Sequence, residues 1–141
     1  MRFLLLLTLL LPATPFGLND THKVAGRWTT IDDQSGKAKS VVEITIAGGR
    51  LSGRIVDLAD KTKLGRLCDQ CPGDRKDKPI VGLEVIRDMH ADGDQWSGGT
   101  ILDPETGKIY DCKLWLEDGK LKVRGYVAFF YRTQTWVKGK G

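Results

Sequence analysis

The feature of the sequence that most constrains the fold is a series of short apolar runs separated by turn-forming residues. In several runs, apolar and polar side chains alternate. Val42, Ile44 and Ile46 fall on one face, and Glu43 and Thr45 fall on the other. This period of two is typical of antiparallel strands that have one buried face and one solvated face. The alternation therefore predicts an all-β chain.

The turn residues between the runs predict how the strands connect. Short hairpin signals occur at Gly48-Gly49, Asp92-Gly93, 104–107 and Asp118-Gly119, where the residue types tolerate positive φ or turn conformations. The expected strands are residues 24–31, 39–46, 50–58, 79–88, 95–102, 109–117, 120–128 and 131–137. Short strands at this spacing indicate a meander, and closure into a single up-and-down barrel of about eight strands would leave no exposed sheet edge.

The N-terminal residues have the order of a secretory signal peptide. Arg2 precedes an apolar run over residues 3–11, and Pro12 and Pro15 follow it. The run is too short to cross a bilayer as a helix. We expect a signal peptide over residues 1–17, with cleavage after Ala13 as the alternative, and a single barrel domain over 18–141. The mature protein is expected in the periplasm or outside the cell.

Two cysteines, Cys68 and Cys71, lie three positions apart in a long connection, residues 59–78. A zinc site would need about four ligands, and no second paired spacing of ligands is present. A thioredoxin-type centre would need a helix in a βαβ unit. An exported chain meets an oxidising compartment, so a local disulfide is the expected state, with redox, metal or Cys112-paired states as alternatives. Cys112 is expected to be a buried free thiol.

Charge and motifs exclude several functional classes. The net charge is +4, and basic residues do not form a stripe, so nucleic-acid binding is not expected. Nucleophile-elbow, Walker and dinucleotide-binding motifs are absent from the sequence. We therefore expect no cofactor, no catalysis and no stable membrane insertion, and we expect a monomer.

Several segments resemble a bacterial exported family catalogued as domain of unknown function 2147. The resemblance runs in order through "GRWTT", "KSVVEI", "GRIV", "CDQC", "KPIVGLEVIR", "WSGGTILDPETGKIYDCKL", "LKVRGYV" and "RTQTW". The family is grouped with lipocalin-like barrels, which implies about eight strands around a cavity. Gly26-x-Trp28 resembles the opening signature of those barrels. Lipocalins pair this tryptophan with an arginine on a late strand, and the resemblance offers Arg124 or Arg132 for that role.

Three functions remain compatible with the sequence. The first is non-catalytic binding of a small hydrophobic ligand inside the barrel, which an eight-stranded barrel can accommodate. Residues expected at that site are Trp96, Tyr110, Leu114 and Leu83. The second is an envelope interaction protein whose barrel is filled by side chains and holds no ligand. The third is a thiol-disulfide oxidoreductase that uses Cys68 and Cys71.

Overall fold

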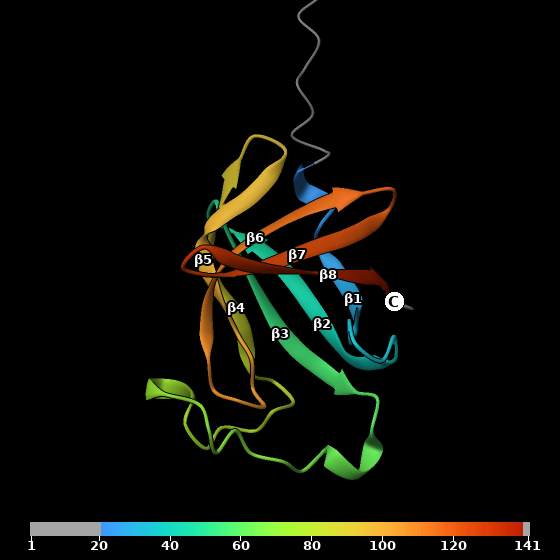
Figure 1. Cartoon of the computed structure of the whole chain (residues 1–141), viewed down its shortest axis with the longest axis vertical. Coiled ribbons are helices and arrows are strands. Elements are labelled where there is room, and N and C mark those ends of the chain that lie inside the picture. The colour runs from blue at the N-terminus through green and yellow to red at the C-terminus, as the bar shows by residue number, and fades with distance from the viewer. Residues whose placement is uncertain (1–20, 140–141) are drawn as a thin grey trace, which may run out of the picture.

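The structure is a computed structural model that describes residues 21–139. It is a closed antiparallel barrel of eight strands in sequence order, as predicted (Figure 1). The strands are β1 (Gly26–Ile31), β2 (Ala38–Ala47), β3 (Arg50–Leu58), β4 (Glu84–Asp92), β5 (Gln95–Leu102), β6 (Ile109–Glu117), β7 (Lys120–Val127) and β8 (Phe130–Lys138). Two short 3₁₀ turns, η1 (Lys61–Lys63) and η2 (Gly73–Arg75), lie between β3 and β4.

The barrel closes between its first and last strands. Trp28 and Thr29 of β1 pair with Lys138 and Val137 of β8. Every strand therefore has two hydrogen-bonded neighbours, and the sheet has no free edge. The predicted signal peptide, residues 1–17, lies outside the described residues. Within residues 21–139, no helix is long and apolar enough to span a bilayer.

The fourth strand differs from its prediction. Residues 79–83 were expected to open the strand, but they belong to the preceding connection, which therefore runs over residues 59–83. Gly82 adopts a φ of 98°, a left-handed conformation that interrupts an extended run. Its N–H still donates to the Ile55 carbonyl at 2.7 Å, so the segment follows β3 without forming a regular strand. At the other end, β4 continues past residue 88 and places Met89 in the core.

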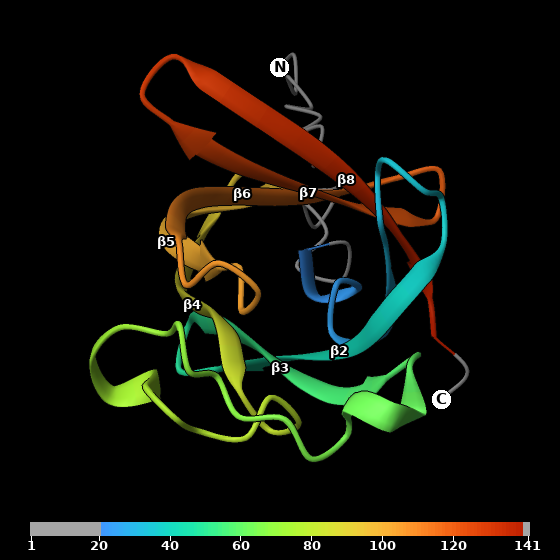
Figure 2. The ribbon, with the colours of Figure 1, turned by 60° about the horizontal axis from the view of Figure 1, so that its bottom comes forward.

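The two ends of the barrel are built differently. At one end, the segment that precedes β1 lies across the opening (Figure 2). Trp96 donates its indole N–H to the Thr21 carbonyl at 3.0 Å, and Trp28 donates to the Val24 carbonyl at 2.8 Å. Both indoles are almost fully buried. This end, which we call the plugged end, is packed solid by Val24, Trp28, Leu51, Met89, Trp96, Leu114 and Leu121.

Candidate functional site

The opposite end of the barrel contains a cavity of about 1020 Å³. We call this end the mouth. It is surrounded by the β1–β2 loop, the connection 59–83, the β5–β6 loop and the β7–β8 turn. The deeper wall is largely apolar, and its members are Val42, Ile55, Leu58, Ile80, Val85, Ile101, Leu102, Val123 and Trp136. A volume of this size can hold a small organic molecule.

A few polar groups lie among the apolar side chains of the cavity. The Trp136 indole donates to the Gln134 side-chain oxygen at 2.9 Å, and both residues line the cavity. The Thr30 and Ser40 hydroxyls share a hydrogen bond of 2.7 Å. Within residues 21–139, no side chain forms a hydrogen bond with the hydroxyl of Tyr110, which also lines the cavity. The deeper wall is therefore mostly apolar. Charged side chains, among them Lys63, Arg66 and Asp69, also line the cavity and could orient a ligand.

Ion pairs surround the mouth. Lys39 lies 3.0 Å from Glu105 and 3.5 Å from Asp32, and so joins the β5–β6 and β1–β2 loops. Burial alone would lower the pKa of Lys39, but these two carboxylates outweigh burial and raise it. Arg132 of β8 pairs with Asp33 at 3.1 Å. These pairs connect the loops around the cavity entrance.

The structure brings only part of the expected site together. Tyr110 lines the cavity. Leu114 and Trp96 instead belong to the plugged end, and Leu83 is buried where the connection 59–83 joins β4. Strand alternation correctly places Leu114 inside the barrel, but alternation does not distinguish one end of a barrel from the other.

Sequence reasoning missed several residues that line the cavity: Thr30, Ser40, Gln134 and Phe130. Three of these side chains are polar, so they were not counted with the apolar inner face. Gln134 lies two residues from the buried Trp136 and two from Arg132, which lines the cavity at the mouth, and that periodicity was the signal that could have identified it.

The expected pairing of Trp28 with Arg124 or Arg132 is wrong. Lys138 lies over the Trp28 ring, with its ammonium 5.5 Å from the ring centre. Arg132 pairs with Asp33 at the mouth instead. Lys138 reaches Trp28 because strand closure makes these two residues direct partners.

Arg124 lies on the outer wall of the barrel. Its guanidinium is 4.9 Å from the Trp115 ring centre and 4.3 Å from that of Tyr131, and its Nε donates to Thr133 at 2.7 Å. Residue 124 alternates with the inward-facing residues of β7, so it cannot reach the core. Trp115 is also on the solvated face, because it alternates with the buried Leu114 of β6.

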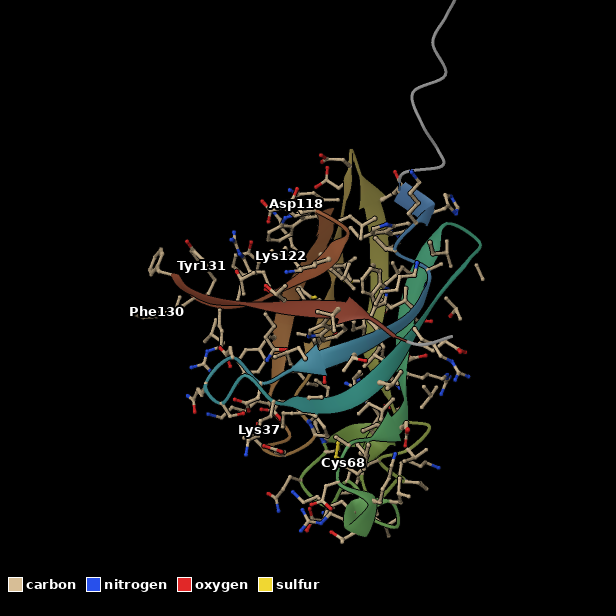
Figure 3. All side chains as sticks on the ribbon, turned by 90° about the vertical axis from the view of Figure 1, so that its right-hand side faces the viewer. Lys37, Cys68, Asp118, Lys122, Phe130 and Tyr131 are labelled. Atoms are coloured by element: carbon tan, nitrogen blue, oxygen red, sulfur yellow. A yellow bond between two sulfur atoms is a disulfide. The ribbon has the colours of Figure 1, made fainter. Side chains whose placement is uncertain are left out.

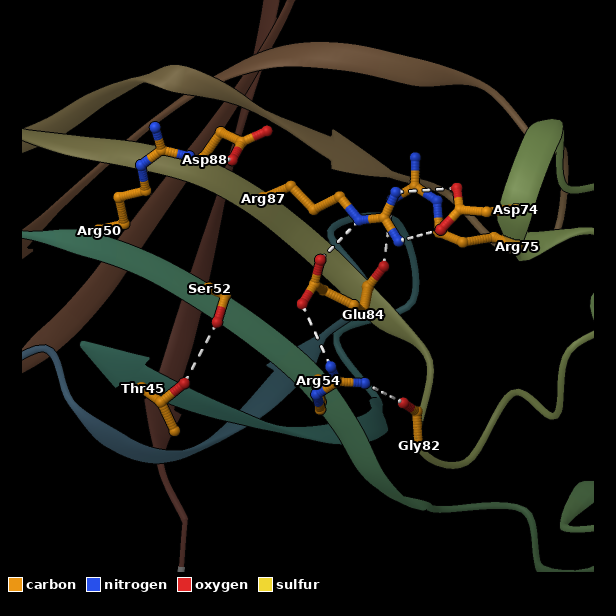
Figure 4. Close-up of polar contacts among 10 residues, drawn as sticks. All are labelled: Thr45, Arg50, Ser52, Arg54, Asp74, Arg75, Gly82, Glu84, Arg87 and Asp88. Carbon is orange, nitrogen blue, oxygen red and sulfur yellow. Dashed lines mark hydrogen bonds and ion pairs between the residues drawn. The ribbon is translucent and has the colours of Figure 1, made fainter. Parts of the chain in front are cut away.

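The connection 59–83 is held against the barrel by an ion-pair network (Figure 4). Arg87 of β4 binds both carboxylate oxygens of Asp74, at 3.0 and 2.7 Å, and its Nε donates to Glu84 at 2.6 Å. Glu84 also pairs with Arg54 of β3. Hydrogen bonding to Arg87 lowers the pKa of Asp74. Beside this network, Arg75 is buried and donates to the Glu84 carbonyl at 3.1 Å.

The disulfide between Cys68 and Cys71 is confirmed. Both residues are buried, at 0% and 1% exposure, and the Cys68 N–H donates to the Lys78 carbonyl at 2.7 Å. The bond closes a tight ring inside the connection, and η2, which follows it, has only three residues. A buried disulfide is poorly placed for exchange, because a thiolate must reach one of its sulfurs.

Cys112 is a buried free cysteine, as expected. Burial raises the pKa of its thiol to about 12, which keeps it protonated at neutral pH. In residues 21–139, no group of three or more His, Cys, Asp or Glu side chains is arranged to hold a metal ion.

The closed eight-stranded barrel with a cavity at one end defines a lipocalin-like fold. The structure is similar to protein HP1028 from the human pathogen Helicobacter pylori, described as a member of the lipocalin family. The TM-score is 0.71 at 17% sequence identity, over 82% of each chain. It is also similar to a mutant of the fluorescent protein UnaG, with a TM-score of 0.50 at 16% identity, over 85% of this chain and 99% of that one.

The sequence itself identifies the family. Residues 26–138 match the family described as an uncharacterized protein conserved in bacteria, DUF2147. The match spans all eight strands, and the chain belongs to this family. No curated protein sequence matches the chain.

Proposed function

We propose that this protein is a non-catalytic binder of a small hydrophobic ligand, and that it acts in the periplasm or outside the cell. The observation that carries the proposal is the cavity of about 1020 Å³ at the mouth. Its deeper wall is largely apolar while the plugged end is filled, so binding would remove apolar ligand surface from water without rearranging the core.

The internal side chains favour this proposal over a filled barrel. Gly125 faces inward at the level of Tyr110, where strand alternation would otherwise place a large side chain. A Cβ on Gly125 would only touch the Tyr110 side chain, at 3.4 Å from its Cβ, and both residues line the cavity. A larger side chain at this position would therefore take up cavity volume. The lipocalin-like neighbours support a barrel that surrounds a binding site.

The redox alternative is less well supported. Both sulfurs of the Cys68–Cys71 pair are buried, and the pair lies in an irregular connection and not at the start of a long helix. Export, which the disulfide is consistent with, would let this bond persist.

The proposal is tested by native mass spectrometry of the protein recovered after export from its own bacterial envelope. We expect a discrete non-covalent adduct that disappears when the protein is denatured and refolded in clean buffer. The released molecule, extracted into organic solvent, should be a small hydrophobic compound. A single apo mass in protein that also fails to bind a dansyl-labelled fatty acid would reject ligand binding.

A further inference from the structure

The most unusual surface feature of the molecule is the turn between β7 and β8. Phe129 is 98% exposed and Phe130 is 80% exposed, and both are flanked by the exposed side chains of Val127 and Tyr131. We call residues Val127–Tyr131 the aromatic tip. Single exposed apolar residues are common, but a continuous group of this kind marks an interaction surface.

The aromatic tip projects away from the barrel wall. The β7–β8 hairpin extends beyond the ring of strands (Figure 2), and the side chains of Phe130 and Tyr131 point outward from its end (Figure 3). Its turn contains two residues, with Ala128 at a φ of 52°. A non-glycine residue rarely adopts this conformation, so the turn holds Phe129 at the extremity at some conformational cost.

The aromatic tip is continuous with the mouth of the cavity. Val127, Phe130 and Tyr131 line the cavity as well as the tip, whereas Phe129 does not line it. A molecule that leaves the cavity on this side therefore passes along exposed apolar side chains before it reaches water.

The hairpin that carries the tip is basic. The segment 120–138 contains five basic side chains and no Asp or Glu. The five are Lys120, Lys122, Arg124, Arg132 and Lys138. Two of them lie beside the tip: Arg124, which stacks on Tyr131, and Arg132, which also pairs with Asp33. Lys120 and Lys138 lie at the opposite end of the hairpin. Exposed aromatic side chains next to basic ones are the combination that binds the interface of an anionic bilayer, where rings enter the headgroup region and cations meet lipid phosphates.

We propose that the aromatic tip docks on the surface of a bilayer that contains anionic phospholipid, and that the docked cavity exchanges its ligand with that bilayer. A protruding two-residue turn suits a soft lipid interface better than a flat protein surface, which would leave the sides of the hairpin uncovered. The exchange rests on the proposed function, because it requires a hydrophobic ligand that partitions into membranes. The docking does not rest on the proposed function.

The test is vesicle flotation with the protein purified after export, so that all variants share the same N-terminus. The vesicles contain phosphatidylethanolamine and phosphatidylglycerol, with phosphatidylcholine vesicles for comparison. The test variant is Phe129→Ser, which removes the most exposed ring without changing the cavity lining. The control is Val137→Ser, because Val137 is an exposed apolar residue on β8 outside the tip.

We expect the wild-type protein and Val137→Ser to float with the anionic vesicles, and binding to fall as salt rises. Phe129→Ser should lower the partition coefficient about tenfold, since one phenylalanine is no longer transferred from water to lipid. Equal flotation of wild type and Phe129→Ser would overturn the docking. The docking would also be overturned if the wild-type protein does not bind vesicles and the tip instead forms a dimer. Such a dimer would be detected as a change in sedimentation between the wild type and Phe129→Ser.

A second measurement separates the docking from ligand binding. A dansyl-labelled fatty acid is titrated in the absence of vesicles, and its transfer out of labelled vesicles is followed in a stopped-flow experiment. Phe129→Ser should keep the wild-type affinity but take up the probe from vesicles more slowly. Probe binding without vesicle binding would reject the docking and leave the proposed function standing. Vesicle binding without probe binding would reject the proposed function and leave the docking standing.

Discussion

The backbone carbonyl of Gln70 lies directly against the α-carbon of Gly107, so that a Cβ on Gly107 would overlap it. Gln70 is within the disulfide ring of the connection 59–83, and Gly107 is in the β5–β6 loop. Two segments of the mouth thus meet backbone to backbone at this point. The Cys68 sulfur lies 3.6 Å from the Pro104 carbonyl in the same loop, which shows that the contact extends over both segments.

The first prediction concerns this contact. Gly107→Ala should lower the free energy of unfolding by about 3 kcal/mol, because the methyl group both displaces Gln70 and occupies a left-handed backbone position. Gly119→Ala is a matched control, since its φ of 73° is close to the 75° of Gly107 and nothing lies near its Cβ. Gly119→Ala should lower the free energy of unfolding by only about 1 kcal/mol. Urea unfolding measures both variants. Equal losses would show that the Gln70 contact does not matter.

The second prediction places the ligand. Gly125→Leu should weaken binding of a dansyl-labelled fatty acid about tenfold or more, because the new side chain fills the space beside Tyr110. Lys120→Leu puts the same side chain on an outward-facing position of the same strand and should not change affinity. Fluorescence titration measures both. An unchanged affinity in folded Gly125→Leu would place the ligand outside this cavity.

The third prediction concerns the disulfide. Replacing both cysteines, Cys68→Ala with Cys71→Ala, should lower the free energy of unfolding by about 2 kcal/mol, as expected for a ring this short. Affinity for a hydrophobic probe should change little, because neither cysteine lines the cavity. Urea unfolding and probe titration are the measurements. A large loss of affinity with unchanged stability would give the bond a functional role.

The fourth prediction concerns the free thiol. Cys112 should resist a thiol-specific reagent in the folded protein at pH 7, since burial limits access and its pKa is raised to about 12. One thiol per chain should react at once in guanidinium chloride without reductant. Rapid labelling under native conditions would indicate that β5 or β7 opens next to Cys112, because these strands flank β6.

The fifth prediction concerns pH. Because hydrogen bonding to Arg87 lowers the pKa of Asp74 from 3.8 in the folded protein, the contact stabilises the fold above about pH 4. That stabilisation is lost as pH falls through the lowered pKa. Asp74→Asn should therefore lower Tm at pH 7, and the difference in Tm from the wild type should disappear as pH falls through the lowered pKa of Asp74. Asp94→Asn, in the exposed β4–β5 turn, should not reproduce this difference. A difference in Tm between Asp74→Asn and the wild type that stays constant over the whole pH range would contradict the prediction.

Local patterns were sufficient to predict most of the barrel. Strands β3, β5 and β6 have the bounds that alternation and turn residues predicted, because each is bordered by a recognisable turn. The β7–β8 turn gave no such signal, since Ala128 and Phe129 are not typical turn residues. The start of β4 was misplaced because residues 79–83 are apolar but follow an irregular path along β3.

The candidate site was less predictable, because it depends on which barrel end each residue reaches. Trp96 and Tyr110 look alike in sequence as inward aromatic residues with a polar group. Only the closed structure shows that Trp96 binds the segment before β1 while Tyr110 lines the cavity. Lys138 was likewise missed as the partner of Trp28, because closure of the last strand on the first sets that register.

The segment before β1, which closes the plugged end, determines how a molecule can enter and leave the cavity. Because Trp28 and Trp96 are hydrogen-bonded to that segment, the barrel is closed at this end and open at the mouth. A molecule that enters the cavity through the mouth must also leave through the mouth, so binding of one molecule and release of another cannot occur at the same time. The direction of any delivery would then be set by what the mouth faces at each encounter and by the concentration of the bound molecule there, because the described residues close the plugged end.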